Sequence, residues 1–161
     1  LSYQDPSIAQ VDYPFPMVNP NIQGKRYPRT PDFEVGREKV REFARAVFAS
    51  KESLDLEYAI SLGHKDLVVP PTFPVVIQEQ SLKLVLDDPH SQIDFSRVVH
   101  GDQRFKFERP IVAGDVLTSE LSVASVKSLG GNHMVSFETE IFDEGNHLVC
   151  TAFSTLVVRG E

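Results

Sequence analysis

The fold of this 161-residue chain is decided by residues 104–158, which read RFKFERPIVAGDVLTSELSVASVKSLGGNHMVSFETEIFDEGNHLVCTAFSTLVV. Apolar side chains recur here at every second position, first at Phe105 and Phe107 and later at Val135 and Phe137. A period of two is typical of strands with one buried face. We therefore expect an antiparallel β-meander over Arg104–Val158.

Turn residues divide this stretch into four strands. Gly114 lies in the first turn, Gly130-Gly131-Asn132 forms a hairpin turn, and residues 143–146 reverse the chain again. The last strand, Leu148–Val158, is apolar on both faces at several points, which favours a central position in the sheet.

The residues before the sheet predict the helix that covers it. Residues 72–86 read TFPVVIQEQSLKLVL, with Thr72 as the expected N-cap and Pro74 in the first turn. The first turns are apolar almost all round, which indicates burial, whereas Gln78, Gln80 and Lys83 predict that the second half emerges toward solvent. A sheet wrapped around one long apolar helix is the hotdog architecture, so the predicted class is α+β with a hotdog fold.

Two further helices are expected upstream. Residues 37–49 carry one apolar stripe, and a short helix over 55–62 ends at Gly63, a residue suited to a left-handed cap. Prolines keep residues 18–33 extended, with a short strand at Lys25–Tyr27 or Asp32–Val35. We expect residues 18–161 to form a single hotdog domain. Residues 1–17 are expected to be a disordered leader or extended tail, with Met17 as the natural start.

Composition narrows the function classes. A formal charge of −7 argues against a nucleic-acid partner, and no apolar run reaches the roughly 18 residues that a membrane helix needs. The single cysteine, Cys150, excludes an internal disulfide and fits a cytoplasmic protein, where it is expected to be buried and inert. The histidines and acids lack the spacing of metal ligands, so neither a metal nor a cofactor is predicted.

Residues 98–117, VVHGDQRFKFERPIVAGDVL, resemble the MaoC-like dehydratases, in particular those with an N-terminal-type hotdog domain. The resemblance includes residues 62–73, LGHKDLVVPPTF, and covers about residues 18–158. It is close to the non-catalytic subunits of actinobacterial (3R)-hydroxyacyl-thioester dehydratases and to their uncharacterised relatives. Hotdog domains usually pair edge to edge, so we expect a dimer.

The family adds water to, or removes it from, an acyl thioester. An Asp and a His in the loop after the first helix activate the water, and the central helix start, His-Gly, donates a backbone N–H to the thioester oxygen. Here the Asp position falls on Phe48 and the His position on Ser53, while Asp55 matches a later, structural acid. Pro70-Pro71 replaces His-Gly and cannot donate, which leaves Thr72 or Phe73 as the alternative donor.

The resemblance therefore implies a dehydratase or hydratase subunit that shapes the acyl tunnel while a MaoC-like partner supplies the catalytic Asp and His. It implies no catalytic residue in this chain, and an acyl thioester of coenzyme A or acyl carrier protein as ligand. The substrate-binding residues that it suggests are Thr72, Phe73, Val76, His100, Gly101 and Asp102. Two alternatives stay open: a homodimeric acyl-thioester-binding module without dehydratase activity, and a thioesterase that uses Glu79 near the central helix.

The motif His100-Gly101-Asp102 has two interpretations. His100 and Asp102 line the tunnel mouth or contact the catalytic subunit in the first. In the second, Gly101 forms a bulge and His100 satisfies a backbone carbonyl. The residues alone favour the second, because a polar loop residue has a structural role more often than a functional one.

Overall fold

The computed structural model describes residues 18–160, so the expectation for residues 1–17 lies outside the described residues. The helices are α1 (Arg37–Ala46), α2 (Leu56–Ser61) and α3 (Pro74–Leu86), with 3-10 turns at Pro20–Ile22, Lys51–Ser53 and Phe95–Arg97. The strands are β1 (Phe33–Glu34), β2 (Val98–Phe107), β3 (Val116–Leu129), β4 (Asn132–Asp143) and β5 (Leu148–Val158).

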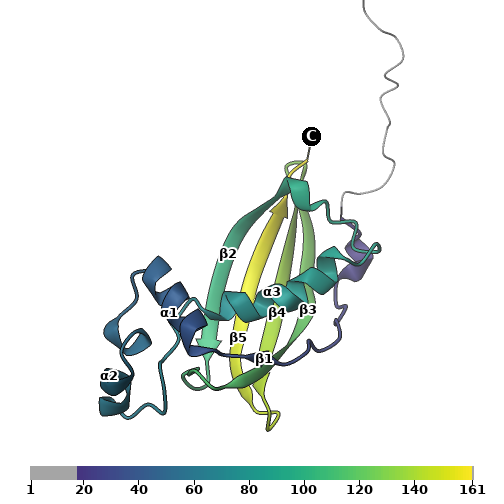
Figure 1. Ribbon diagram of the computed structural model, residues 1–161. Coiled ribbons are helices and arrows are strands. Elements are labelled where there is room, and N and C mark those ends of the chain that lie inside the picture. The colour runs from purple at the N-terminus through teal and green to yellow at the C-terminus, as the bar shows by residue number, and fades with distance from the viewer. Residues whose placement is uncertain (1–17, 161) are drawn as a thin grey trace, which may run out of the picture.

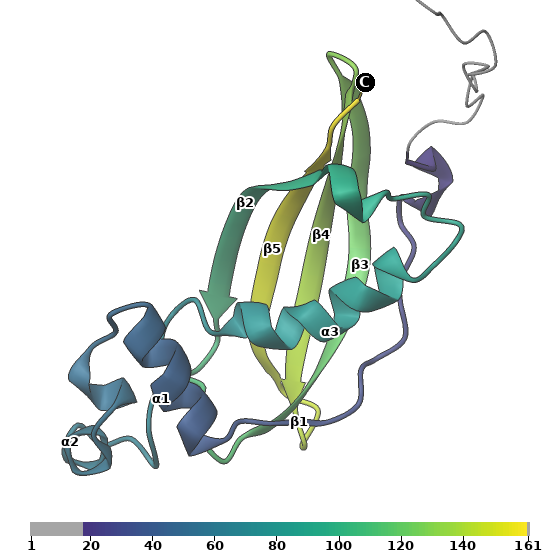
Figure 2. The same cartoon turned by 45° about the horizontal axis from the view of Figure 1, so that its top comes forward.

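The strands form one antiparallel sheet in the order β1-β3-β4-β5-β2, curled around α3 (Figure 1). This is the hotdog fold. Figure 2 shows α3 running across the concave face, with α1 and α2 beyond the end of β2 where α3 begins. The strand β5 lies between β4 and β2, as its apolar faces predict.

The predicted meander from Arg104 is wrong in one respect. Only β3, β4 and β5 follow one another, whereas β2 pairs with β5, with Phe105 opposite Ala152. The cause lies in the connection after β2, which bonds to the segment before α3 instead of closing a hairpin. Val69 N–H donates to Ile111 O at 3.0 Å, and Ala113 N–H donates to Leu67 O at 2.9 Å.

The other turns and caps follow the sequence closely. Gly130 and Gly131 have φ of +58° and +79° and join Leu129 to Asn132, which is the two-residue turn that the right-handed twist of a hairpin prefers. Asp55 caps α2 by accepting a hydrogen bond from Tyr58 N–H at 3.1 Å, and Gly63 follows α2 with φ +90°.

Helix α1 stops at Ala46, three residues before the predicted end. Phe48 adopts a left-handed conformation with φ +53°, and Ala49 N–H returns to Ala44 O at 2.9 Å. These bonds satisfy the last carbonyls of the helix and end it.

Helix α3 begins at Pro74, whose missing N–H costs nothing in the first turn. The N-cap predicted at Thr72 is wrong, because Phe73 occupies the cap position and no side chain caps this helix. The Phe73 ring is fully buried and meets Phe43 edge-on at 5.3 Å between ring centroids. Burying one such ring contributes roughly 1.5–3 kcal/mol.

Gln78 contradicts the expected emergence of the second half of α3 toward solvent, because it is only 3% exposed. The helix lies across the sheet, so this position faces the strands and not the surface. Gln78 is retained there because the strands offer it hydrogen-bond partners, which is what a buried amide requires.

The core accordingly consists of two apolar clusters with polar side chains between them. One cluster surrounds Phe73 and Ile77, and the other surrounds Val85 and Phe137. We call the buried polar residues between them the polar seam: Gln78 and Ser81 of α3, Ser119 of β3, Thr139 of β4 and Ser154 of β5. Within residues 18–160 no helix has the length and apolarity needed to cross a membrane.

Candidate functional site

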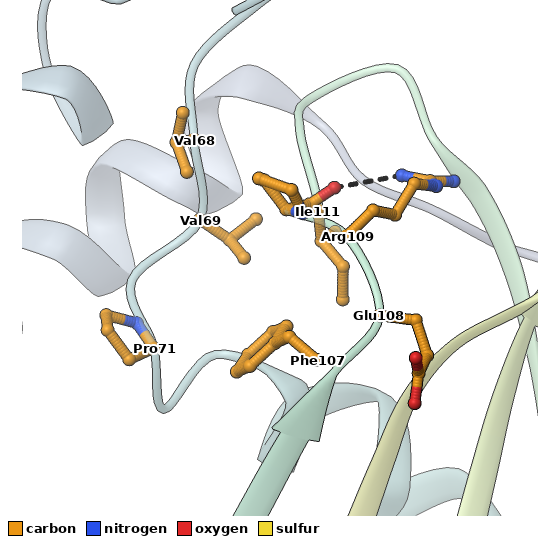
Figure 3. Close-up of a pocket in the computed structure, with 8 residues that line it drawn as sticks. Val68, Val69, Pro71, Phe107, Glu108, Arg109 and Ile111 are labelled. Atoms are coloured by element: carbon orange, nitrogen blue, oxygen red, sulfur yellow. Dashed lines mark hydrogen bonds between the residues drawn. The ribbon is translucent and has the colours of Figure 1, made fainter.

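A pocket of about 340 Å³ lies at the start of α3, between the segment that precedes the helix and the end of β2 (Figure 3). Its walls are mostly apolar, and the backbone bonds between residues 67–69 and 111–113 hold them together. The lining residues are Val68, Val69, Pro71, Phe107, Glu108, Arg109, Pro110 and Ile111.

The one cation of this lining, Arg109, is already paired. Its guanidinium donates to Asp115 at 2.8 Å and 3.2 Å and to Pro110 O at 3.0 Å, and it lies 3.5 Å from Asp143. The hydrogen bonds to Asp115 raise the pKa of Arg109. The pocket therefore offers apolar surface to a ligand, with Glu108 exposed at its rim.

The start of α3 offers one free backbone donor. Phe73 N–H donates to Pro70 O at 2.9 Å, and Val75 and Val76 donate to Thr72 and Phe73. Prolines occupy positions 70, 71 and 74. In this part of the described chain only Thr72 N–H lacks a hydrogen-bond partner, so of the two alternative donors Phe73 is already used.

The loop after α1 places no acid–base pair at the positions that the resemblance singles out. Phe48 is 95% exposed, while Ser53 is 2% exposed and lies in a 3-10 turn with its N–H bonded to Ser50 O at 3.2 Å. A phenyl ring has no proton to exchange, and a buried serine hydroxyl is no base at neutral pH. Asp55, the nearby carboxylate, is the cap of α2.

A β-bulge in β2 separates His100 from Asp102. The register shifts between these residues, so that His100 lies opposite Leu156 and Asp102 opposite Thr155. Leu156 belongs to the core, which puts His100 on the inner face of β2, and Asp102 lies on the outer face. The bulge expected at Gly101 is confirmed, but His100 bonds to the Gln103 side chain and not to a backbone carbonyl.

The inner face of β2 leads from His100 to the pocket. Gln103, Phe105 and Phe107 follow His100 on this face, and all three are half-buried because α3 does not cover them completely. At roughly 3.3 Å per residue, His100 and Phe107 lie about 20 Å apart. We call these four side chains the β2 strip.

The predicted site residues therefore form two groups. Thr72, Phe73 and Val76 lie at the start of α3, where Thr72 is exposed, Phe73 is buried and Val76 is half-buried. His100, Gly101 and Asp102 lie at the far end of β2. The pocket and Gln103 were not anticipated. Gln103 shares its alternation with Phe105 and Phe107, a pattern that would have indicated its inner-face position.

Other reactive groups are accounted for elsewhere. Burial raises the pKa of the Cys150 thiol to about 12, which leaves it without nucleophilic character at neutral pH. Glu79 is exposed on α3, where Gln78 is the neighbour that faces the sheet. Across residues 18–160 no three His, Cys, Asp or Glu side chains gather in a metal-binding arrangement.

Residues 21–152 match the family model described as FAS1-like, dehydratase domain region. A UPF0336 protein of Leifsonia xyli subsp. xyli is 58% identical over 145 residues, covering 89% of this chain and 97% of that protein. A UPF0336 protein of Streptomyces griseus subsp. griseus is 47% identical over 143 residues, covering 88% of this chain and 95% of that protein.

Solved structures give the same result. The C-terminally truncated HadBC (3R-hydroxyacyl-ACP dehydratase) complex of Mycobacterium tuberculosis contains a chain with 33% identity and a TM-score of 0.74, covering 87% of this chain and 99% of that one. A MaoC-like dehydratase gives 27% identity and a TM-score of 0.78, covering 86% of this chain but 42% of that one.

These matches extend over most of the residues that form the sheet, α3 and the pocket. The chain belongs to the FAS1-like dehydratase-region family of MaoC-like hotdog proteins, together with the actinobacterial UPF0336 proteins.

Proposed function

From this membership we propose that the chain is a subunit of a (3R)-hydroxyacyl-thioester dehydratase or enoyl-thioester hydratase. It shapes the acyl-binding site, and a MaoC-like partner supplies the catalytic Asp and His. The observation that carries the proposal is the exposed Phe48 and the buried Ser53, where the family resemblance places the acid–base pair. In this proposal residues 18–161 act as one cytoplasmic hotdog domain.

A two-subunit enzyme has a precedent in the HadBC complex, a dehydratase built from different chains. The open edge of β2 supports an assembly of this kind. In the described sheet β2 pairs only with β5, so its other edge keeps backbone donors and acceptors that a second strand can bond. The partner would extend the sheet at β2 and cover the β2 strip.

The pocket and the β2 strip support acyl binding. An acyl thioester is a long molecule with an apolar tail and an amide-containing arm, and this surface is a long, half-covered strip with apolar and polar ends. Thr72 N–H supplies one donor beside the pocket. Phe73 and Val76 would fix the wall of the site, and Gly101 with Asp102 would lie at its far rim.

The test is co-expression with a catalytic-type MaoC-like protein from the same organism, followed by an assay of crotonyl-thioester hydration. We expect the two chains to co-purify and the complex to hydrate the substrate, and we expect this chain alone to be inactive. Replacing the partner's catalytic Asp by Asn should abolish the activity of the complex. Hydration by this chain alone, at the rate of the complex, would falsify the proposal.

The acyl-binding part is tested by two substitutions on opposite faces of β2. Phe107→Ser changes the pocket wall, whereas Arg104→Ser changes the exposed, opposite face of the same strand, outside the pocket lining. Losing apolar contact worth about 1.4 kcal/mol raises KM of the complex roughly tenfold for the first variant only. Equal KM values in both variants, with unchanged thermal unfolding, count against acyl binding here.

If the chain purifies alone as a homodimer that still binds acyl thioesters, the homodimeric binding module is the better description. The thioesterase alternative receives no support from the site, because Glu79 is exposed and away from the pocket lining.

A further inference from the structure

The bulge at Gly101 places His100 and Gln103 on the same, inner face of β2. Residues three apart in a regular strand point to opposite faces, yet His100 and Gln103 both point inward and their side chains meet at 3.1 Å. The bulge brings Gly101 close to β5, since a Cβ there would lie 3.2 Å from Thr155 O and from Val157 Cγ2. A residue larger than glycine therefore crowds the position that aims His100 inward.

A chain of hydrogen bonds connects His100 to the polar seam. Gln103 Nε2 donates to Gln78 Oε1 at 3.1 Å, and Gln78 Nε2 donates to Ser154 Oγ at 2.9 Å and to Thr139 Oγ at 3.3 Å. These bonds run from an exposed strand edge into the centre of the core. All three inner partners, Gln78, Thr139 and Ser154, are at most 5% exposed, so the relay is anchored in the buried interior of the protein.

The amide orientations in the structure assign the proton of His100 to one of its two ring nitrogens. Both N–H groups of the Gln78 amide face hydroxyls, and its oxygen accepts from Gln103. The Gln103 oxygen is then left to accept from His100 Nε2. In the neutral ring Nδ1 carries no proton, and it makes no hydrogen bond with the described residues.

We propose that Gln78 and Gln103 are positioning residues, which hold His100 so that Nδ1 accepts a hydrogen bond from a donor group of an acyl-pantetheine thioester. The ligand class rests on the proposed function and on the β2 strip, which joins His100 to the apolar pocket. Such a molecule offers two kinds of donor, the amide N–H groups of the pantetheine arm and the hydroxyl of a 3-hydroxyacyl group. Both match a fixed acceptor.

The positioning is tested by ¹⁵N NMR of the histidine rings in the full chain at pH 8. We expect wild-type His100 to hold its proton on Nε2 alone. In Gln103→Leu the chemical shifts of both His100 ring nitrogens should move to those of the urea-unfolded chain. In Gln103→Glu the carboxylate accepts the hydrogen bond again, so the Nε2–H form should return. Gln80→Leu, at a glutamine of α3 outside the relay, should leave the spectrum unchanged. A proton on Nδ1, or a wild-type ring identical to the unfolded one, overturns the positioning.

The ligand is tested by adding three probes to the same sample: pantetheine, crotonyl-pantetheine and 3-hydroxybutyryl-pantetheine. A shift of His100 Nδ1 with all three identifies an amide donor, and a shift with the third alone identifies the hydroxyl. In Gln103→Leu we expect the probes to bind roughly 2- to 10-fold more weakly, which corresponds to the loss of one hydrogen bond. If none of the probes moves the signal, the ligand assignment is wrong.

These outcomes are independent of the co-purification. If an active complex forms but no probe shifts the His100 Nδ1 signal, this inference is contradicted and the proposed function is not affected. A chain that finds no partner but shows the His100 response contradicts the proposed function alone.

Discussion

Phe48 combines a strained backbone conformation with an exposed side chain, and neither feature stabilises the fold. Its φ of +53° is unfavourable for a side chain with a Cβ, by roughly 1–2 kcal/mol, and its ring is 95% exposed. The conformation is imposed by the end of α1, where glycine is the usual residue. The ring contributes almost no burial in return.

We therefore expect Phe48→Gly to raise the free energy of unfolding by about 1 kcal/mol, because glycine adopts this conformation without strain. Urea denaturation of the two proteins measures the difference. Ala46→Gly, two residues earlier and still helical, is the matched control and should lower stability by roughly 0.5–1 kcal/mol. A Phe48→Gly variant less stable than wild type would show that the ring makes contacts worth more than the strain.

At the scale of elements, the polar seam between α3 and the sheet raises the question of whether its hydrogen bonds stabilise the fold. Gln78→Leu leaves Gln103, Ser154 and Thr139 without their partner, which costs roughly 1–3 kcal/mol. Adding Ser154→Ala and Thr139→Val removes the two buried unpaired hydroxyls, so stability should return toward the wild-type value. Chemical denaturation of the single and triple variants decides this. A triple variant with a much lower free energy of unfolding than the single variant would mean that the polar seam stabilises the fold.

The end of α3 is fastened to the N-terminal segment by Asp88. Its carboxylate accepts from Lys25 Nζ at 2.6 Å and from Tyr27 OH at 2.7 Å, and these two bonds hold the pKa of Asp88 well below its usual range. A depressed folded pKa means that the unfolded chain takes up the proton first. The stabilisation is therefore present above pH 4 and is lost as the pH falls further.

Asp88→Asn should consequently be less stable than wild type at pH 7, and its stability should change less between pH 5 and pH 2. Thermal unfolding across this range gives both slopes. Asp32→Asn, at an exposed carboxylate without an ion pair among the described residues, serves as control and should follow the wild-type slope. Parallel slopes for wild type and Asp88→Asn would exclude a role for this carboxylate.

For the whole molecule, Cys150 reports on global unfolding because it is the sole cysteine, is fully buried and lies in β5, an interior strand of the sheet. With the pKa of its thiol raised to about 12, the native protein should react with a thiol reagent only through unfolding. The labelling rate at pH 8 should therefore equal the rate of an exposed thiol multiplied by the fraction of unfolded chain. Urea should raise this rate in step with the loss of circular dichroism. Fast labelling in native buffer would reveal local opening of β5.

Much of this architecture was predictable from local patterns. The Gly130-Gly131 turn, the strands on either side and the helix beginning at Pro74 each have a signal within a few residues. The position of β2 beside β5 has no such signal, since it depends on bonds between residues 67–69 and 111–113. Gln78 was misplaced for the same reason, because its partners are contributed by strands 61 and 76 residues away.

The site was predictable only in part. The absence of an acid–base pair follows from Phe48 and Ser53, which can be read directly. The pocket requires residues from two distant segments to face each other, and the separation of His100 from Asp102 requires the bulge. Alternation alone would have placed these two side chains on the same face, since they are two residues apart.

The open edge of β2 also bears on how the chain behaves when it is produced in excess. Along the ten residues of β2, the edge that faces away from β5 forms a template on which further copies can stack into aggregates. Asp102, Arg104 and Lys106 place a charge at every second position along the exposed outer face of this strand, which discourages such stacking. Replacing them by neutral residues should reduce the soluble yield, and supplying a strand that caps the edge should restore it.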